Sequence, residues 1–211
     1  MAEINVSELK PVGEFGSKVW CEACVAYGVK LLEDGDLPVD LAWGFSEIYL
    51  NPPARLLSDG RTLSGYYMMV KDGVISGGDG ASAECRSLSG FHVEIPWAAI
   101  CNQSASLYGR EGQRQRSLDE QVMFKAIEEY VGRPNPLELK AREKPVWPPA
   151  VGAALSKGSE EGGGLHNIAA TLQAPSPEFA EFPTTELGVP VFSAMSEEQK
   201  RAFLEMLRVT I

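Results

Sequence analysis

The segment LAWGFSEIYL, residues 41–50, is the clearest strand signal in the chain. Successive side chains of a β-strand point to opposite faces, and the residues of this segment alternate accordingly. One face carries large apolar side chains and one acid: Leu41, Trp43, Phe45, Glu47 and Tyr49. Asn51-Pro52-Pro53 ends the strand, because proline cannot donate a hydrogen bond to a neighbouring strand. The segment therefore predicts a strand whose apolar face includes a carboxylate.

Further strand signals follow along the chain. Residues 65–71 hold two tyrosines and two methionines, and Asp72-Gly73 predicts a tight hairpin turn into a strand at 74–75. Additional strands are expected around residues 81–88 and at 91–95. Together these segments predict an antiparallel sheet.

Helical patterns flank the strands. Ser17 is a good N-cap for a helix that ends at Asp34-Gly35, and further helices are expected over residues 97–107 and 117–130. The order helix, sheet, helices predicts an α+β domain over residues 1–133, in which the antiparallel sheet is packed by helices.

The character of the chain changes after residue 133. Residues 134–195 are rich in proline and glycine and have little periodicity, so we expect an extended C-terminal arm. Residues 196–211 predict a terminal docking helix, with Ser196 and Gln199 as a capping box. Such an arm packs in cis or on a second subunit. Residues 134–211 are therefore a candidate surface for a homo-oligomer or a partner subunit.

The amino-acid composition and net charge limit the classes of partner that the protein can bind. The 211 residues are 44% hydrophobic and 23% charged, as in an ordinary globular domain. With 29 acidic and 19 basic residues the net charge is −10, which argues against nucleic acid or an anionic membrane surface as a partner. The apolar runs are too short to span a bilayer, so the protein is not expected to be membrane-embedded. The N-terminal segment MAEINVSELKPVGEF lacks the pattern of a signal peptide, which favours a cytoplasmic protein with reduced thiols.

The cysteines do not predict a metal or cofactor site. Cys21 and Cys24 have CxxC spacing, but both lie inside the first predicted helix, whereas structural zinc needs four ligands. Cys85 and Cys101 stand alone in the sequence. Packing in the core is the favoured role for Cys24, and a metal or redox role for the pair is the alternative.

Two residues are candidate catalytic groups. Glu47 shares a strand face with aromatic residues, where its pKa would rise, as suits a general acid or base or a polar contact to a ligand. The alternative is that Glu47 lies at a solvent-exposed edge of the sheet. His92 and Glu94 lie on one face of the strand at 91–95, about 6.5–7 Å apart along it, so a solvated polar face competes with an acid–base pair.

The interior is rich in aromatic and thioether side chains, which also line pockets for apolar small molecules. The residues expected to bind a ligand are Trp43, Phe45, Tyr67, Met69 and Trp97. Glu47 is expected to be the polar contact of this pocket.

The order of elements over residues 17–131, together with the segment GYYMMVKDG at 65–73, resembles the sterol-carrier class of small lipid-binding domains. The resemblance implies a lipid-binding α+β fold, and it carries no functional residues over to this chain.

Three functions are therefore consistent with the sequence. The first is binding of a small apolar or aromatic molecule between sheet and helices. The second is a cofactor-independent isomerase, hydratase or lyase that uses Glu47 or His92 to carry a proton. The third is a non-catalytic subunit that binds another chain through residues 134–211.

Overall fold

A computed structural model describes residues 8–97, 126, 129, 140–141, 146–158, 164–184 and 190–210. The helices predicted at 97–107 and 117–130 lie almost entirely outside these residues, as does Cys101.

The centre of the fold is a five-stranded sheet with the order β4-β3-β2-β5-β6. Its strands are β2 (Trp43–Leu50), β3 (Ser64–Lys71), β4 (Val74–Asp79), β5 (Gly90–Pro96) and β6 (Lys140–Ala141). Within this sheet the pairing is antiparallel except between β2 and β5, which run parallel. The α+β class is confirmed, but the prediction of a purely antiparallel sheet is wrong.

The mixed pairing arises from the connection between β4 and β5. Two hairpin steps make β4 run in the same direction as β2, and the chain then crosses the sheet before it enters β5. This crossover contains α2 (Ala83–Ser87), which packs on β2 and β3. A crossover of this kind delivers the next strand in parallel orientation.

The strand predicted around residues 81–88 is therefore a short helix. The Ser82 hydroxyl accepts a hydrogen bond from the Cys85 backbone amide, 3.1 Å away, and so caps the first turn. The Cys85 thiol then donates to the carbonyl oxygens of Phe45 and Met68, each at 3.3 Å. Periodicity over so few residues does not distinguish a helical turn from a strand.

The turn between β3 and β4 follows its sequence signal. Asp72 and Gly73 both have positive φ angles, as a type I′ hairpin turn requires at its two central positions. The predicted hairpin is confirmed.

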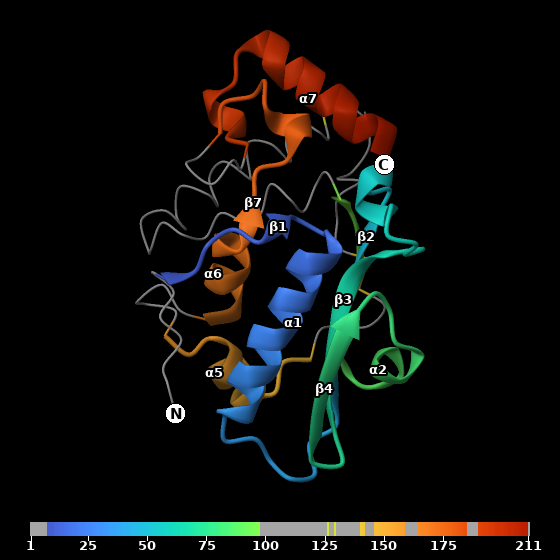
Figure 1. Cartoon of the computed structure of the whole chain (residues 1–211), viewed down its shortest axis with the longest axis vertical. Coiled ribbons are helices and arrows are strands. Elements are labelled where there is room, and N and C mark those ends of the chain that lie inside the picture. The colour runs from blue at the N-terminus through green and yellow to red at the C-terminus, as the bar shows by residue number, and fades with distance from the viewer. Residues whose placement is uncertain are drawn as a thin grey trace.

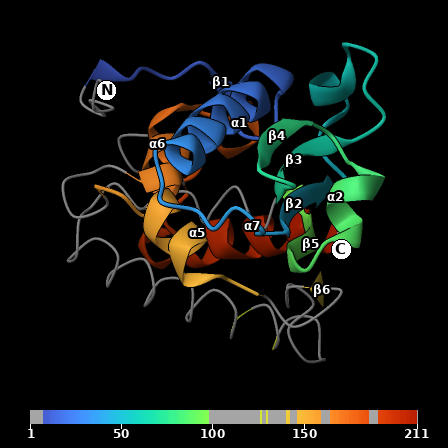
Figure 2. The same cartoon turned by 90° about the horizontal axis from the view of Figure 1, so that it is seen from below.

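The helix α1 (Lys18–Glu33) begins where it is predicted, because the Ser17 hydroxyl accepts from the backbone amide of Trp20 and so satisfies a free amide of the first turn. It packs on β3 and β4, on the side of the sheet opposite to α2 (Figure 1). Two further helices, α5 (Pro149–Leu155) and α6 (Gly164–Thr171), lie beside it and form a helical layer along the sheet (Figure 2).

The helices α5 and α6 lie in the stretch expected to be an extended arm. The Trp20 indole donates to the Ala169 carbonyl of α6 at 2.9 Å, so this part of the stretch packs in cis. β1 (Gly13–Glu14) also pairs in parallel with β7 (Gln173–Ala174). Helices shorter than three turns show too few periods to stand out from a proline- and glycine-rich background.

The last elements are the short 3₁₀ turns η4 (Pro177–Phe179) and η5 (Phe192–Ala194) and the helix α7 (Glu197–Thr210). The predicted capping box is present. The Ser196 amide donates to the Gln199 side chain at 3.0 Å, and the Gln199 amide donates to the Ser196 hydroxyl at 3.2 Å. Phe203 of α7 is fully buried in a cluster of aromatic rings. Its neighbours are Phe179, Phe182 and Phe192.

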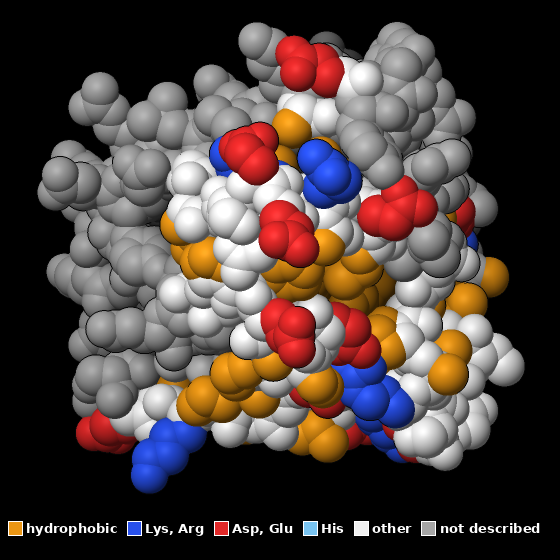
Figure 3. All heavy atoms as spheres, turned by 90° about the horizontal axis from the view of Figure 1, so that it is seen from above, with side chains coloured by type: hydrophobic (Ala, Val, Ile, Leu, Met, Phe, Trp, Pro, Cys, Tyr) orange, Lys and Arg blue, Asp and Glu red, His pale blue; other side chains and the backbone are white. Residues whose placement is uncertain are grey.

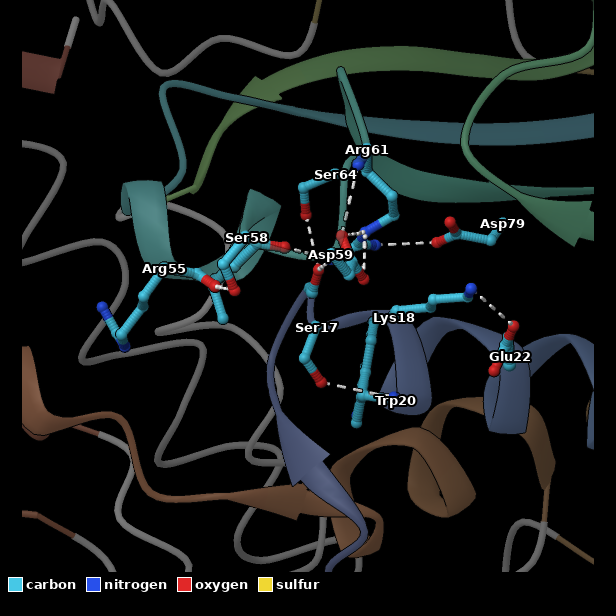
Figure 4. Close-up of polar contacts among 12 residues, drawn as sticks. Ser17, Lys18, Trp20, Glu22, Arg55, Ser58, Asp59, Arg61, Ser64 and Asp79 are labelled. Carbon is cyan, nitrogen blue, oxygen red and sulfur yellow. Dashed lines mark hydrogen bonds and ion pairs between the residues drawn. The ribbon is translucent and has the colours of Figure 1, made fainter.

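The turn η2 (Ala54–Leu57) and the loop after it are tied to the rest of the fold by two arginines. Arg61 forms an ion pair with Asp79 of β4 at 2.8 Å and donates to the carbonyl of Gly16, just before α1 (Figure 4). Arg55 forms ion pairs with Glu14 and Glu178, which belong to distant parts of the sequence. These contacts join the start of α1, the sheet and the C-terminal third of the chain.

Gly90 provides a test of the parallel contact between β2 and β5. A Cβ atom at Gly90 would lie 1.8 Å from the Gly44 carbonyl oxygen, so a side chain there must push the strands apart. Gly90→Ala should therefore lower the free energy of unfolding by about 2–3 kcal/mol, as measured by urea unfolding.

The matched control is Gly152→Ala in α5, where a Cβ atom meets nothing within 4 Å. This change should raise stability by up to about 1 kcal/mol, the usual preference of a helix for alanine. Equal effects of the two substitutions would contradict the close contact between the strands.

Candidate functional site

The face of the sheet that packs against α1 holds Glu47 among apolar side chains. Strand register places Glu47 between Tyr66 of β3 and Val93 of β5. On its own strand, Phe45 and Tyr49 lie two residues away on the same face. The structure therefore places Glu47 on the inner side of the sheet, facing the helical layer.

The Glu47 carboxylate has one strong polar neighbour. The Tyr49 hydroxyl donates a hydrogen bond to Glu47 Oε2 at 2.8 Å. Among the described residues, no lysine, arginine or histidine forms an ion pair with Glu47. The acid is thus held by a neutral donor and lacks a positive partner in this part of the chain.

Burial controls the ionisation of this group. Loss of solvation raises the pKa of Glu47 above its usual value, and the hydrogen bond from Tyr49 offsets part of that rise. Burial also raises the pKa values of Cys24, Tyr49 and Tyr66, and a negative charge on Glu47 raises them further. The three neighbours therefore stay protonated at neutral pH, and Glu47 has the lowest ordinary pKa in this set.

The Glu47 site is not completely sealed. Glu47 is only partly buried, although Tyr49 and Tyr66 on either side of it are buried. In the described part of the chain, the buried side-chain nitrogen and oxygen atoms without a partner are Arg86 Nε and Ser176 Oγ. The Glu47 carboxyl and the Tyr66 hydroxyl are not among them, and no described residue hydrogen-bonds to that hydroxyl. Within the described ranges, both groups therefore keep hydrogen-bonding capacity for a small polar molecule such as water.

Aromatic rings form a continuous wall next to Glu47. Phe45 stacks on Phe91 with ring centres 5.7 Å apart, and Tyr66 lies 5.6 Å from Phe45. Trp147 covers the first two rings, at 6.1 Å from Phe45 and 5.4 Å from Phe91, and it is 44% exposed. Trp43 completes the wall at 5.6 Å from Trp147. We call this set, Trp43, Phe45, Tyr66, Phe91 and Trp147, the aromatic wall.

Hydrogen bonds fix Trp147 in place. The Trp43 indole donates to the Val146 carbonyl at 3.0 Å, and the Val146 amide donates to the Gly90 carbonyl at 2.9 Å. Trp147 and Phe91 were not predicted as site residues. Trp147 lies in a proline-rich stretch without periodicity, whereas the alternation at 91–95 already placed Phe91 on an apolar face.

The structure does not bring all the expected ligand-binding residues together. Trp43 and Phe45 lie in the aromatic wall beside Glu47. Tyr67 and Met69 pair with Ser46 and Gly44, so they lie on the opposite face of the sheet. Side chains alternate along β3, and for this reason Tyr66 faces Glu47 where Tyr67 does not.

Trp97, the remaining expected ligand-binding residue, belongs to another cluster. Its indole donates to the Phe15 carbonyl at 2.9 Å, and its ring stacks on Phe179 with centres 5.7 Å apart. It is buried by the C-terminal third of the chain.

His92 lies on the α2 side of the sheet, away from Glu47. Its Nδ1 is 2.9 Å from the Ser46 hydroxyl, and its Nε2 is 3.0 Å from the Leu88 carbonyl. Because a carbonyl can only accept, Nε2 donates to Leu88, and Nδ1 shares a hydrogen bond with the Ser46 hydroxyl. Glu94 forms an ion pair with Arg86. The structure thus gives His92 and Glu94 separate partners, and His92 and Glu47 lie on opposite faces.

The described cysteines are free and buried. Burial raises the pKa of Cys21 to about 12 and that of Cys85 to about 11, so both thiols are protonated and unreactive at neutral pH. Within the described ranges, no three His, Cys, Asp or Glu side chains converge as a metal site requires.

Comparison of this chain with protein-family models, with curated proteins and with solved structures finds no match. In the parts of the chain that the structure describes, none of the helices has the length and apolar character needed to cross a membrane.

Replacing Glu47 tests its burial. The pKa of Glu47 is raised in the folded state, so the folded state binds the proton more tightly, and stability falls as pH rises from the unfolded to the folded pKa. Glu47→Gln removes this loss, and it should raise the melting temperature by about 3 °C at pH 7, corresponding to roughly 1 kcal/mol. The gain should shrink towards pH 4, in thermal melts followed by circular dichroism.

Glu22→Gln is the control for this change, because Glu22 is exposed on α1 and forms a long ion pair with Lys18 at 4.0 Å. It should change the melting temperature little at any pH. A Glu47→Gln protein that is less stable than the parent at pH 7, but not at pH 4, would contradict the raised pKa.

Proposed function

We propose that the protein binds a small apolar or aromatic molecule that carries a polar group, on the inner face of the sheet beside Glu47. The observation that carries the proposal is the partly accessible Glu47 carboxyl, which has no cationic partner among the described residues and lies next to the aromatic wall. Binding sites for small molecules typically combine an apolar lining with a few polar groups that orient the ligand.

The two kinds of group would have different roles. The aromatic wall offers ring faces whose contact with an apolar ligand is favourable in proportion to the area removed from water. Glu47 and the Tyr66 hydroxyl would supply the polar contacts, since neither is saturated by other described residues. A ligand whose apolar part lies on the aromatic wall and whose polar group hydrogen-bonds to Glu47 or Tyr66 would be stabilised both by the buried apolar area and by the hydrogen bonds.

The exposure of Trp147 supports a binding site that a ligand can reach from the protein surface. Trp147 is 44% exposed, and its ring packs on Phe45 and Phe91. A large exposed aromatic ring at the edge of an apolar cluster is typical of a ligand-binding or interaction surface. The tryptophan also provides an optical signal for occupancy of the site.

A screen of simple amphiphilic compounds tests the proposed function. We expect at least one of 4-phenylbutan-1-ol, cyclohexanol and octan-1-ol to raise the melting temperature in a concentration-dependent way and to change tryptophan emission. A ligand at 100 times its Kd adds about 2.7 kcal/mol to stability. If none of a broad panel of such compounds produces either effect, the proposed function is wrong.

Two adjacent tyrosines give a matched pair of variants. Tyr66→Phe removes a hydroxyl next to Glu47, and it should weaken binding of a hydroxyl-bearing probe about five- to tenfold. Tyr67→Phe removes the same group on the opposite face of the sheet and should leave the affinity unchanged. Isothermal titration calorimetry on both variants measures the difference, and equal losses would place the ligand elsewhere.

A further inference from the structure

We propose that the ligand of the Glu47 site is an organic cation, namely a small aromatic or alkyl amine in its ammonium form. The ammonium group would pair with the Glu47 carboxylate, and its apolar part would lie against the aromatic wall. This inference rests on the proposed function and adds the charge of the ligand to it.

Glu47 lacks a counter-ion among the described residues. Carboxylates that leave bulk water are normally paired with a cation or held by several donors. Glu47 receives one hydrogen bond, from the neutral Tyr49 hydroxyl, and no described basic side chain contacts it. A ligand with one positive charge would form an ion pair with the Glu47 carboxylate and offset the free energy that its partial desolvation costs. A neutral ligand would leave that free-energy cost uncompensated.

The side chains around the acid also favour a cation. The faces of aromatic rings carry negative electrostatic potential, so they attract an ammonium group that lies within about 6 Å of a ring centre. Strand register places the Tyr66 ring beside Glu47, and Phe45 follows at 5.6 Å from Tyr66. An ammonium group held between the carboxylate and the face of one of these rings would therefore be attracted in two ways, by charge and by the ring potential.

The field of the whole protein acts in the same direction. The chain has a net charge of −10, from 29 acidic and 19 basic residues. Figure 3 shows acidic and basic side chains spread over the face at the α7 end, with hydrophobic side chains between them. A negative field of this kind raises the local concentration of cations and disfavours the approach of anions.

The pH dependence distinguishes a cation from a neutral ligand. The titratable groups that interact with Glu47 from the described elements are Tyr49 on β2, Tyr66 on β3 and Cys24 on α1. All three are protonated and neutral at physiological pH, because burial raises their pKa values. An ammonium ligand needs ionised Glu47, so its affinity should rise with pH through the pKa of this group. A neutral ligand that accepts a hydrogen bond from protonated Glu47 should show the reverse.

The experiment uses three probes of nearly equal shape on the full chain: 2-phenylethylamine, 2-phenylethanol and phenylacetate. At pH 7.5 we expect the amine to bind at least tenfold more tightly than the alcohol, and phenylacetate to bind more weakly than either. Isothermal titration calorimetry measures the three affinities. The same titrations, repeated as a pH series, should show the affinity of the amine rising through the pKa of Glu47.

Substitution of the acid completes the test. Glu47→Gln should abolish the preference for the amine over the alcohol, whereas the exposed-site control Glu22→Gln should keep that preference. The pH series on the unmodified chain gives the same answer should Glu47→Gln fail to fold.

The outcomes separate the two proposals. If the alcohol binds as tightly as the amine, or if the affinity of the amine is flat or falls with rising pH, the cationic ligand is ruled out while the proposed function stands. If none of the three probes binds and the amphiphile panel also fails, the proposed function itself is wrong.

Discussion

The structure depends on one close contact between backbones, where β5 runs parallel to β2. Gly44 and Gly90 are partners at the start of this pairing, and a Cβ atom on Gly90 would collide with the Gly44 carbonyl. Because neither Gly44 nor Gly90 has a side chain, β5 can enter the sheet directly beside β2 after the crossover through α2. The register set there places Phe91 against Phe45 and leaves Glu47 between two neighbouring strands. The aromatic wall and the candidate site both follow from that register.

The titratable groups on the two faces of the sheet differ in the polar partners that they have. On the α2 side, His92 has partners on both ring nitrogens, and Glu94 has Arg86. Such satisfied groups stabilise the fold and have little capacity left for a ligand. On the α1 side, Glu47 has a raised pKa and one neutral donor. Of these groups, Glu47 therefore has the most capacity to engage a ligand.

Several elements could be predicted from the sequence because their signals are local. The Ser17 cap, the Asp72-Gly73 turn and the Ser196–Gln199 capping box each act over a few neighbouring residues, and all three are present. The mixed sheet could not be predicted in this way, since the direction of β5 depends on where the preceding crossover returns the chain. The short helices α2 and α5 were missed because few turns give little periodicity, and contacts with the sheet and with α1 stabilise them instead.

Alternation along residues 41–50 is enough to put Glu47 on a strand face with aromatic residues, since alternation in a β-strand depends only on the order of residues. Which other residues meet that face does not follow from the order of residues. Only the folded chain shows that Tyr66 rather than Tyr67 lies beside Glu47, that Trp97 belongs to another cluster, and that Trp147 comes from a distant part of the chain to cover Phe45 and Phe91. The face on which a residue lies is a local property of its strand, whereas strand register and long-range packing are set by the burial of the whole core.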